Sequence, residues 1–94
     1  MGDDENAMLD YQRTIEINPT SFNAFYNAGN ILAKRGNYKK AIQHFEMCIR
    51  FLPEIAKPYN RIAQCMELLG NTEKAIENYR KCLQIDPNFA LAKE

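Results

Sequence analysis

The chain has 94 residues, which is the length of one small domain or of a part of a larger one. Its twelve basic residues balance its twelve acidic residues, so the formal net charge at pH 7 is zero. A neutral chain lacks the positive field that draws proteins to nucleic acids or anionic membranes, so we expect neither as a partner. No apolar run approaches the roughly 20 residues that a transmembrane helix needs.

The cysteines and the N-terminus indicate a reducing, cytoplasmic location. Cys48, Cys65 and Cys82 are odd in number and include no CxxC pair, so the sequence predicts neither a disulfide framework nor a bound metal. Residues 1–6, MGDDEN, are acidic and lack the basic and then apolar layout of a secretion signal.

Residues of one kind recur every 34 positions along the chain. The series are proline at Pro19, Pro53 and Pro87, glycine at Gly2, Gly36 and Gly70, alanine at Ala7, Ala41 and Ala75, and a large aromatic residue at Tyr11, Phe45 and Tyr79. A fixed period of this length is typical of helical repeats whose neighbouring units bury each other's apolar faces. The period therefore predicts an array of repeated helical units.

Residues 1–21 are predicted to form the second half of a truncated repeat, because they match only the part of the later units that runs from glycine to proline. We infer a segment of a longer array, or a chain that another molecule completes. The apolar face of this first helix consists of Ala7, Met8, Tyr11 and Ile15. No preceding helix covers this face, so we expect it to be partly exposed and to support self-association.

Residues 22–55 are predicted to form a complete helical hairpin. Apolar residues at amphipathic spacing are Phe25, Ala28, Gly29 and Leu32 in the first half and Ala41, Ile42, Phe45, Cys48, Ile49 and Leu52 in the second. Between the halves, Gly36 is a helix stop and Asn37 is a good N-cap. Gly29 is small where the two helices are expected to cross closely, and Pro53 ends the second helix.

Residues 56–89 are predicted to repeat this hairpin. Gly70 and Asn71 stand at its turn, and Pro87 follows its second helix. Pro58 is compatible with a helix, because proline is tolerated in the first turn. Residues 90–94 are predicted to start a further helix.

These positions resemble the signature of the tetratricopeptide repeat family. The matching residues are Phe25, Ala28, Gly29, Leu32, Ala41, Phe45, Cys48 and Pro53 in the first hairpin and Tyr59, Ile62, Ala63, Met66, Ala75, Tyr79, Cys82 and Pro87 in the second. Ile62 and Ala63 depart from the usual leucine-glycine pair, and Leu32 and Met66 replace the usual tyrosine. The resemblance implies an all-α fold of antiparallel helix-turn-helix repeats, stacked as a right-handed α-solenoid. It also implies that the first helix of each hairpin lines a concave groove.

Polar and basic residues occupy the groove side of these first helices. The candidate ligand-binding residues are Asn23, Asn27, Asn30 and Lys34 from the first hairpin and Lys57, Asn60, Arg61 and Gln64 from the second. Lys57 and Arg61 lie four residues apart on one helical face, and like charges at that spacing cost about 0.2–0.5 kcal/mol. A bound carboxylate would relieve this repulsion, and arginine can hold one in a bidentate fork.

Three of these residues also resemble the carboxylate clamp of chaperone-binding family members. Asn27, Lys57 and Arg61 match the spacing of the clamp's asparagine, lysine and arginine. The resemblance implies the acidic C-terminal tail of a chaperone as a candidate partner. The clamp's further lysine and asparagine belong to a helix that this sequence does not contain. The alternative is a solvated polar groove with no ligand.

Catalysis finds little support in the sequence. The one histidine, His44, has no nucleophile-base set around it, and no phosphate-binding loop or HExxH spacing is present. We therefore expect a non-catalytic protein–protein interaction module, without a cofactor, that binds a peptide or protein segment in the groove. A structural scaffold or oligomerisation segment is the alternative. An RNA-binding helical repeat fits less well, because such arrays have a different period and an anionic partner.

Overall fold

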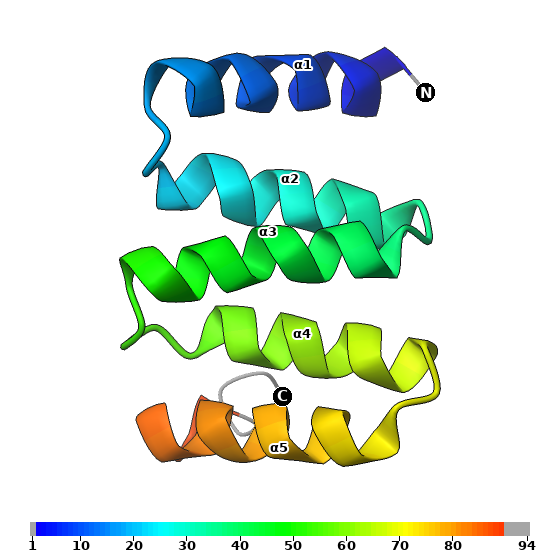
Figure 1. The fold of residues 1–94 in the computed structure, drawn as a ribbon, viewed down its shortest axis with the longest axis vertical. Helices are drawn as coiled ribbons and strands as arrows, with labels where there is room; N and C mark the ends of the chain where they lie inside the picture. The colour runs from blue at the N-terminus through cyan, green and yellow to red at the C-terminus, as the bar shows by residue number, and fades with distance from the viewer. Residues whose placement is uncertain (1, 90–94) are drawn as a thin grey trace.

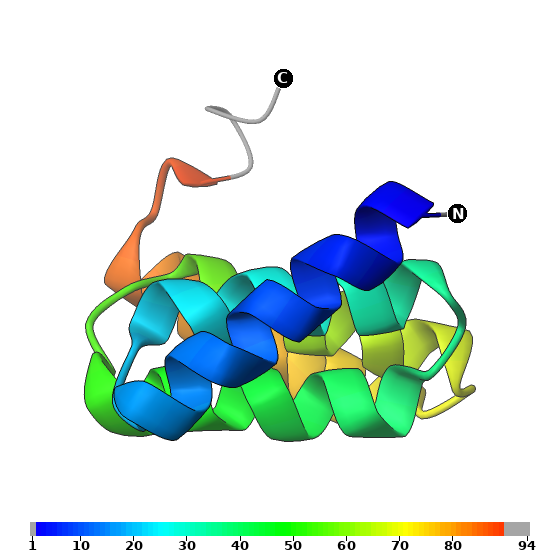
Figure 2. The same cartoon turned by 90° about the horizontal axis from the view of Figure 1, so that it is seen from above.

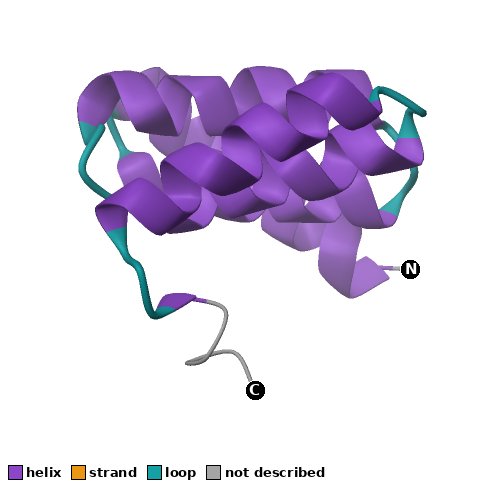
Figure 3. Cartoon of the chain, turned by 90° about the horizontal axis from the view of Figure 1, so that it is seen from below, coloured by secondary structure: helices purple, strands orange, loops and turns teal. Residues whose placement is uncertain are grey.

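The structure, a computed structural model, describes residues 2–89, and the predicted start of a further helix at residues 90–94 lies outside them. The described chain consists of five helices: α1 (Gly2–Ile17), α2 (Phe22–Lys34), α3 (Tyr38–Phe51), α4 (Lys57–Leu68) and α5 (Thr72–Ile85). Each helix runs antiparallel to the one before it and lies beside it (Figure 1). Short loops join the ends of the helices on two opposite sides of the stack (Figure 3). The division into repeat units at residues 22 and 56 stays a prediction.

Glycine makes the turn inside each hairpin. Gly36 and Gly70 have φ angles of +85° and +84°, in the left-handed region that favours glycine. The residue after each glycine bonds back into the preceding helix: Asn37 N–H donates to the Leu32 carbonyl, and Asn71 N–H donates to the Met66 carbonyl, both at 2.8 Å. These are the bonds of a Schellman-type helix end. The predicted helix stops are therefore confirmed.

The side-chain caps follow the prediction at one turn of the two. Asn71 Oδ1 accepts a hydrogen bond of 3.2 Å from the Lys74 N–H, whereas Asn37 makes no side-chain capping bond. The backbones are nearly alike, with φ −97° and ψ 80° at Asn71 and φ −89° and ψ 69° at Asn37, so the backbone does not account for the difference. Ser21 adds a cap that the sequence did not predict, since its hydroxyl accepts from the Ala24 N–H at 3.3 Å.

The first hairpin depends on the close crossing of α2 and α3. A Cβ atom added to Gly29 would lie 2.7 Å from Cε1 of Phe45, which is closer than real carbon contacts. Phe45, Ala28 and Ala41 are all 0% exposed. The missing methyl group at Gly29 therefore lets the Phe45 ring fill the space between the helices. The expected close crossing at Gly29 is confirmed.

The second hairpin has alanine at the position equivalent to Gly29. This residue, Ala63, is 0% exposed, and Ala75 on α5 is 1% exposed. Ile62 of α4 belongs to the same buried cluster as Phe45 of α3, and Met66 packs against that cluster. The two hairpins therefore share one core, which fixes α2 and α4 relative to each other.

The helix α1 is less deeply buried than the others. Of its residues 3–17, Met8 alone is buried, and the other members of its predicted apolar face are half-buried. Leu9 is 54% exposed and Ile17 is 85% exposed. Seen from above, α1 crosses the first hairpin obliquely, with its N-terminal end on the side of α2 and its C-terminal end on the side of α3 (Figure 2). The predicted partial exposure of this helix is confirmed, except at Met8.

Gly29→Ala is expected to destabilise the protein by about 1–3 kcal/mol, because the added methyl group meets the Phe45 ring in a filled core. Urea unfolding followed by circular dichroism measures the change. In a Phe45→Leu background the same substitution should cost much less, because the smaller side chain leaves room for the methyl group. Helix propensity alone would make Gly29→Ala stabilising. A Gly29→Ala protein at least as stable as the parent would therefore contradict the close crossing.

Candidate functional site

A pocket of about 400 Å³ opens between α2 and α4. It is lined by Asn30, Ala33, Lys34, Tyr38, Arg61, Gln64, Cys65 and Leu68. Four of the eight predicted ligand-binding residues are thus brought together: two polar amides and two cations. We call this pocket the α2–α4 groove.

Arg61 is held in place by neighbours on both helices. Its Nε donates to the Tyr26 hydroxyl of α2 at 3.3 Å, and its Nη1 donates to Gln64 Oε1 at 3.3 Å. A guanidinium carries five N–H donors, so these two bonds leave three for a ligand. A cation whose position is already fixed loses less side-chain entropy when it binds a carboxylate.

Tyr26 links Arg61 to the buried core. Its ring stacks on Phe22 at a centroid distance of 5.8 Å and meets Phe45 edge-on at 5.6 Å. The ring is therefore fixed from both sides while its hydroxyl reaches the groove. This role of Tyr26 was not predicted from the sequence, because a bond between residues 35 positions apart depends on how the hairpins stack.

Asn30 contributes a buried acceptor to the α2–α4 groove. Its Oδ1 atom is buried and has no hydrogen-bond donor among the described residues. Buried polar atoms are paired in the great majority of cases, and an unpaired one costs about 1–3 kcal/mol. Because this oxygen is closed to solvent, only the accessible part of the half-buried Asn30 side chain is available to a ligand.

The remaining predicted residues lie elsewhere. Asn27 is half-buried, Asn23 and Lys57 are exposed, and no hydrogen bond or ion pair of the described residues joins Asn27 or Lys57 to Arg61. Asn60 differs from the prediction, because it is only 8% exposed and offers little surface to a ligand. The packing of α4 places that residue inside, which a helical wheel of a single helix does not reveal.

One cation of the α2–α4 groove has an acidic neighbour on α1. Lys34 Nζ lies 3.2 Å from Asp4 Oδ2 of α1, and the two side chains are 73% and 33% exposed. On α4, Glu67 accepts a hydrogen bond from the Tyr79 hydroxyl. Burial, together with this bond and the Glu67 charge, raises the pKa of Tyr79 to about 12. Glu67 is thus engaged by α5, whereas Arg61 keeps its free donors.

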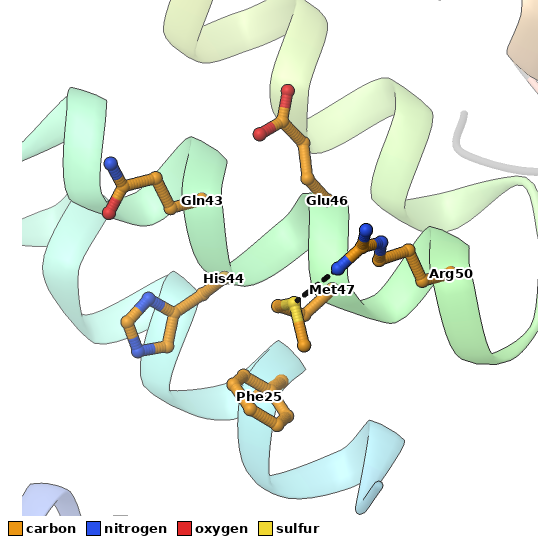
Figure 4. Close-up of a pocket in the computed structure, with 6 residues that line it drawn as sticks. All are labelled: Phe25, Gln43, His44, Glu46, Met47 and Arg50. Atoms are coloured by element: carbon orange, nitrogen blue, oxygen red, sulfur yellow. Dashed lines mark hydrogen bonds between the residues drawn. The ribbon is translucent and has the colours of Figure 1, made fainter.

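A second pocket, of about 740 Å³, lies over α3. Phe25, Gln43, His44, Glu46, Met47 and Arg50 line it (Figure 4). The Phe25 ring packs at 5.7 Å from the His44 ring and at 5.5 Å from Phe51. His44 Nδ1 lies 3.0 Å from the Lys40 carbonyl oxygen, a contact within its own helix. This histidine is therefore engaged with its neighbours.

The cysteines are buried in the helix interfaces. Cys48 is 0%, Cys65 3% and Cys82 2% exposed. Burial raises the pKa of the Cys48 thiol to about 12 and raises the pKa of Cys65. The Cys48 thiol donates to the Phe22 carbonyl at 3.6 Å. Because the thiolate is the reactive form, such thiols are poor nucleophiles at neutral pH.

Two features are absent from the described residues. In the part of the chain from residue 2 to residue 89, no group of three or more histidine, cysteine, aspartate or glutamate side chains could hold a metal ion. In that same part, no helix combines the length and apolar character of a transmembrane span.

Known proteins were compared with the chain as a whole. YrrB, whose structure is described as that of a TPR protein with an unusual peptide-binding site, superposes with a TM-score of 0.87 at 27% identity, over 95% of this chain and 46% of its own. MamA superposes with a TM-score of 0.87 at 26% identity, over 94% of this chain and 52% of its own. This likeness confirms the predicted stack of helix-turn-helix repeats, a right-handed α-solenoid.

Sequence comparison points the same way. The human tetratricopeptide repeat protein 6 is 41% identical over 54 residues, which cover 57% of this chain and 10% of that protein. The chain thus spans about a tenth of this relative and about half of the solved structures. The model of the tetratricopeptide repeat matches residues 20–88. The chain therefore belongs to the tetratricopeptide repeat family.

Proposed function

We propose that the chain binds an extended peptide or protein segment along the α2–α4 groove, with an anionic group of that segment on Arg61. The tetratricopeptide fold supports protein–protein interaction in general, and the peptide-binding site named for YrrB supports a peptide ligand here. The observation that carries the proposal is the guanidinium of Arg61, which Tyr26 and Gln64 hold with three donors left over. The role is non-catalytic.

The anionic group is best supplied by a C-terminal carboxylate or an acidic side chain. A carboxylate can accept two parallel bonds from the remaining guanidinium donors. Lys34 lines the same groove and Lys57 is exposed one turn before Arg61, so both add positive charge on the approach. Asn30 lines the groove too, and the accessible part of its side chain adds a polar contact for the ligand. The acidic C-terminal tail of a chaperone is one ligand of this class, and a cytoplasmic location would suit it.

The test is a pair of acidic peptides, of the sequence Gly-Ser-Asp-Gly-Ser-Asp, one with a free C-terminal carboxylate and one amidated. Fluorescence anisotropy should show tighter binding of the free acid, and Arg61→Ala should weaken that binding by about tenfold or more, because a charge-assisted bond contributes about 1.5–3 kcal/mol. Tyr26→Phe keeps the charge but removes the bond that orients it, so a smaller loss is expected.

The matched control is Arg80→Ala, which removes an exposed arginine from α5. It should leave the affinity unchanged. Equal binding of the two peptides would exclude recognition of the C-terminal carboxylate, and binding of neither would contradict the groove proposal and favour the scaffold role.

Self-association through the two end helices is the second candidate. Its support is the exposed apolar surface on α1, at Leu9 and Ile17, and on α5, at Ile76 and Leu83. Sedimentation velocity over a concentration series should then show a rising mass. A mass of one chain at every concentration would exclude it.

A further inference from the structure

The first turn of α1 and the last turn of α2 lie side by side, because the two helices are antiparallel (Figures 1 and 2). The first turn of α1 carries Asp3, Asp4 and Glu5, and the last turn of α2 carries Lys34. Each charge suits the dipole of its own helix. The only acidic stretch of α1 is thereby placed next to a cation of the α2–α4 groove.

One carboxylate of this stretch, that of Asp4, already forms an ion pair with Lys34. Asp4 Oδ2 lies 3.2 Å from Lys34 Nζ, and the same lysine lines the groove. An acidic ligand that enters the groove offers Lys34 the same chemical group. The carboxylate of Asp4 on α1 therefore competes with an acidic ligand for the charge of Lys34.

Asp4 belongs to α1, the described helix with the fewest buried residues. Of residues 3–17, only Met8 is buried, whereas Leu9 and Ile17 are largely exposed. Segments with few buried apolar contacts open at a lower free energy than the rest of a fold. Lys34 of the ion pair is exposed and Asp4 is half-buried, so the pair is weak enough for an acidic ligand to take the place of Asp4.

We propose that the N-terminal turn of α1 is a tethered competitor, in which Asp4 holds Lys34 and lowers the affinity of the α2–α4 groove for acidic ligands. This inference rests on the proposed function of the groove. Linkage requires the effect to be reciprocal, so an acidic ligand that takes Lys34 loosens the N-terminal turn of α1.

The test is a double-mutant cycle with the free-acid peptide described above. Asp4→Asn should bind the peptide about two- to fivefold more tightly than the parent, which corresponds to the upper range of an exposed ion pair. Lys34→Gln should bind more weakly, and Asp4→Asn should have no effect in the Lys34→Gln background. Glu5→Gln is the matched control, since it removes the same charge from the same helical turn.

Hydrogen exchange supplies a readout that does not depend on affinity. Saturating peptide should speed amide exchange in the first two turns of α1 in the parent, and should not do so in Asp4→Asn. Far-UV circular dichroism checks that each variant is folded.

The outcomes separate the two proposals. Peptide binding to the parent with equal affinities for Asp4→Asn and Glu5→Gln would overturn the tethered competitor and leave the groove proposal intact. An effect of Asp4→Asn that persists in the Lys34→Gln background would do the same. Absence of binding to the parent and to Asp4→Asn alike would overturn both.

Discussion

The contact of the Phe45 ring with the bare backbone of Gly29 is the constraint on which the groove depends. It brings α2 against α3 closely enough for Phe45 to be fully buried. The edge of that ring meets Tyr26, whose hydroxyl in turn receives the Arg61 Nε–H from the next hairpin. Gly29, which has no side chain, thus affects where Arg61 lies in the groove. The rings of Phe45 and Tyr26 connect the two residues. Because interiors are close-packed, a shift at this crossing is transmitted rather than absorbed.

The structure separates two kinds of surface on the same stack. The α2–α4 groove has amides and cations around a guanidinium with unused donors, which suits the proposed carboxylate ligand. The pocket over α3 has the Phe25 ring and Met47 in its lining, and its histidine bonds within its own helix (Figure 4). The two surfaces differ in chemistry, and we expect an acidic peptide to bind in the α2–α4 groove.

The sequence predicted the hairpins because the 34-residue period and the apolar spacing both report which side of each helix is buried. The same signals identified Gly29, Gly36 and Gly70 by their backbone roles, and they placed Arg61, Gln64, Asn30 and Lys34 on one side. The burial of Asn60 and the bond between Tyr26 and Arg61 depend on the angle at which one hairpin packs on the next. The ion pair of Asp4 and Lys34 depends on the oblique course of α1. A pattern within one helix carries no information on such angles.

The central claim is that an acidic ligand lies between α2 and α4. Side-chain resonances of the protein, followed by NMR during titration with the free-acid peptide, test it most directly. The account predicts that the Arg61 Nε–H signal and the side-chain amides of Asn30 and Gln64 shift together and saturate at one affinity. Shifts that instead gather at His44 and Met47, with Arg61 unmoved, would contradict it.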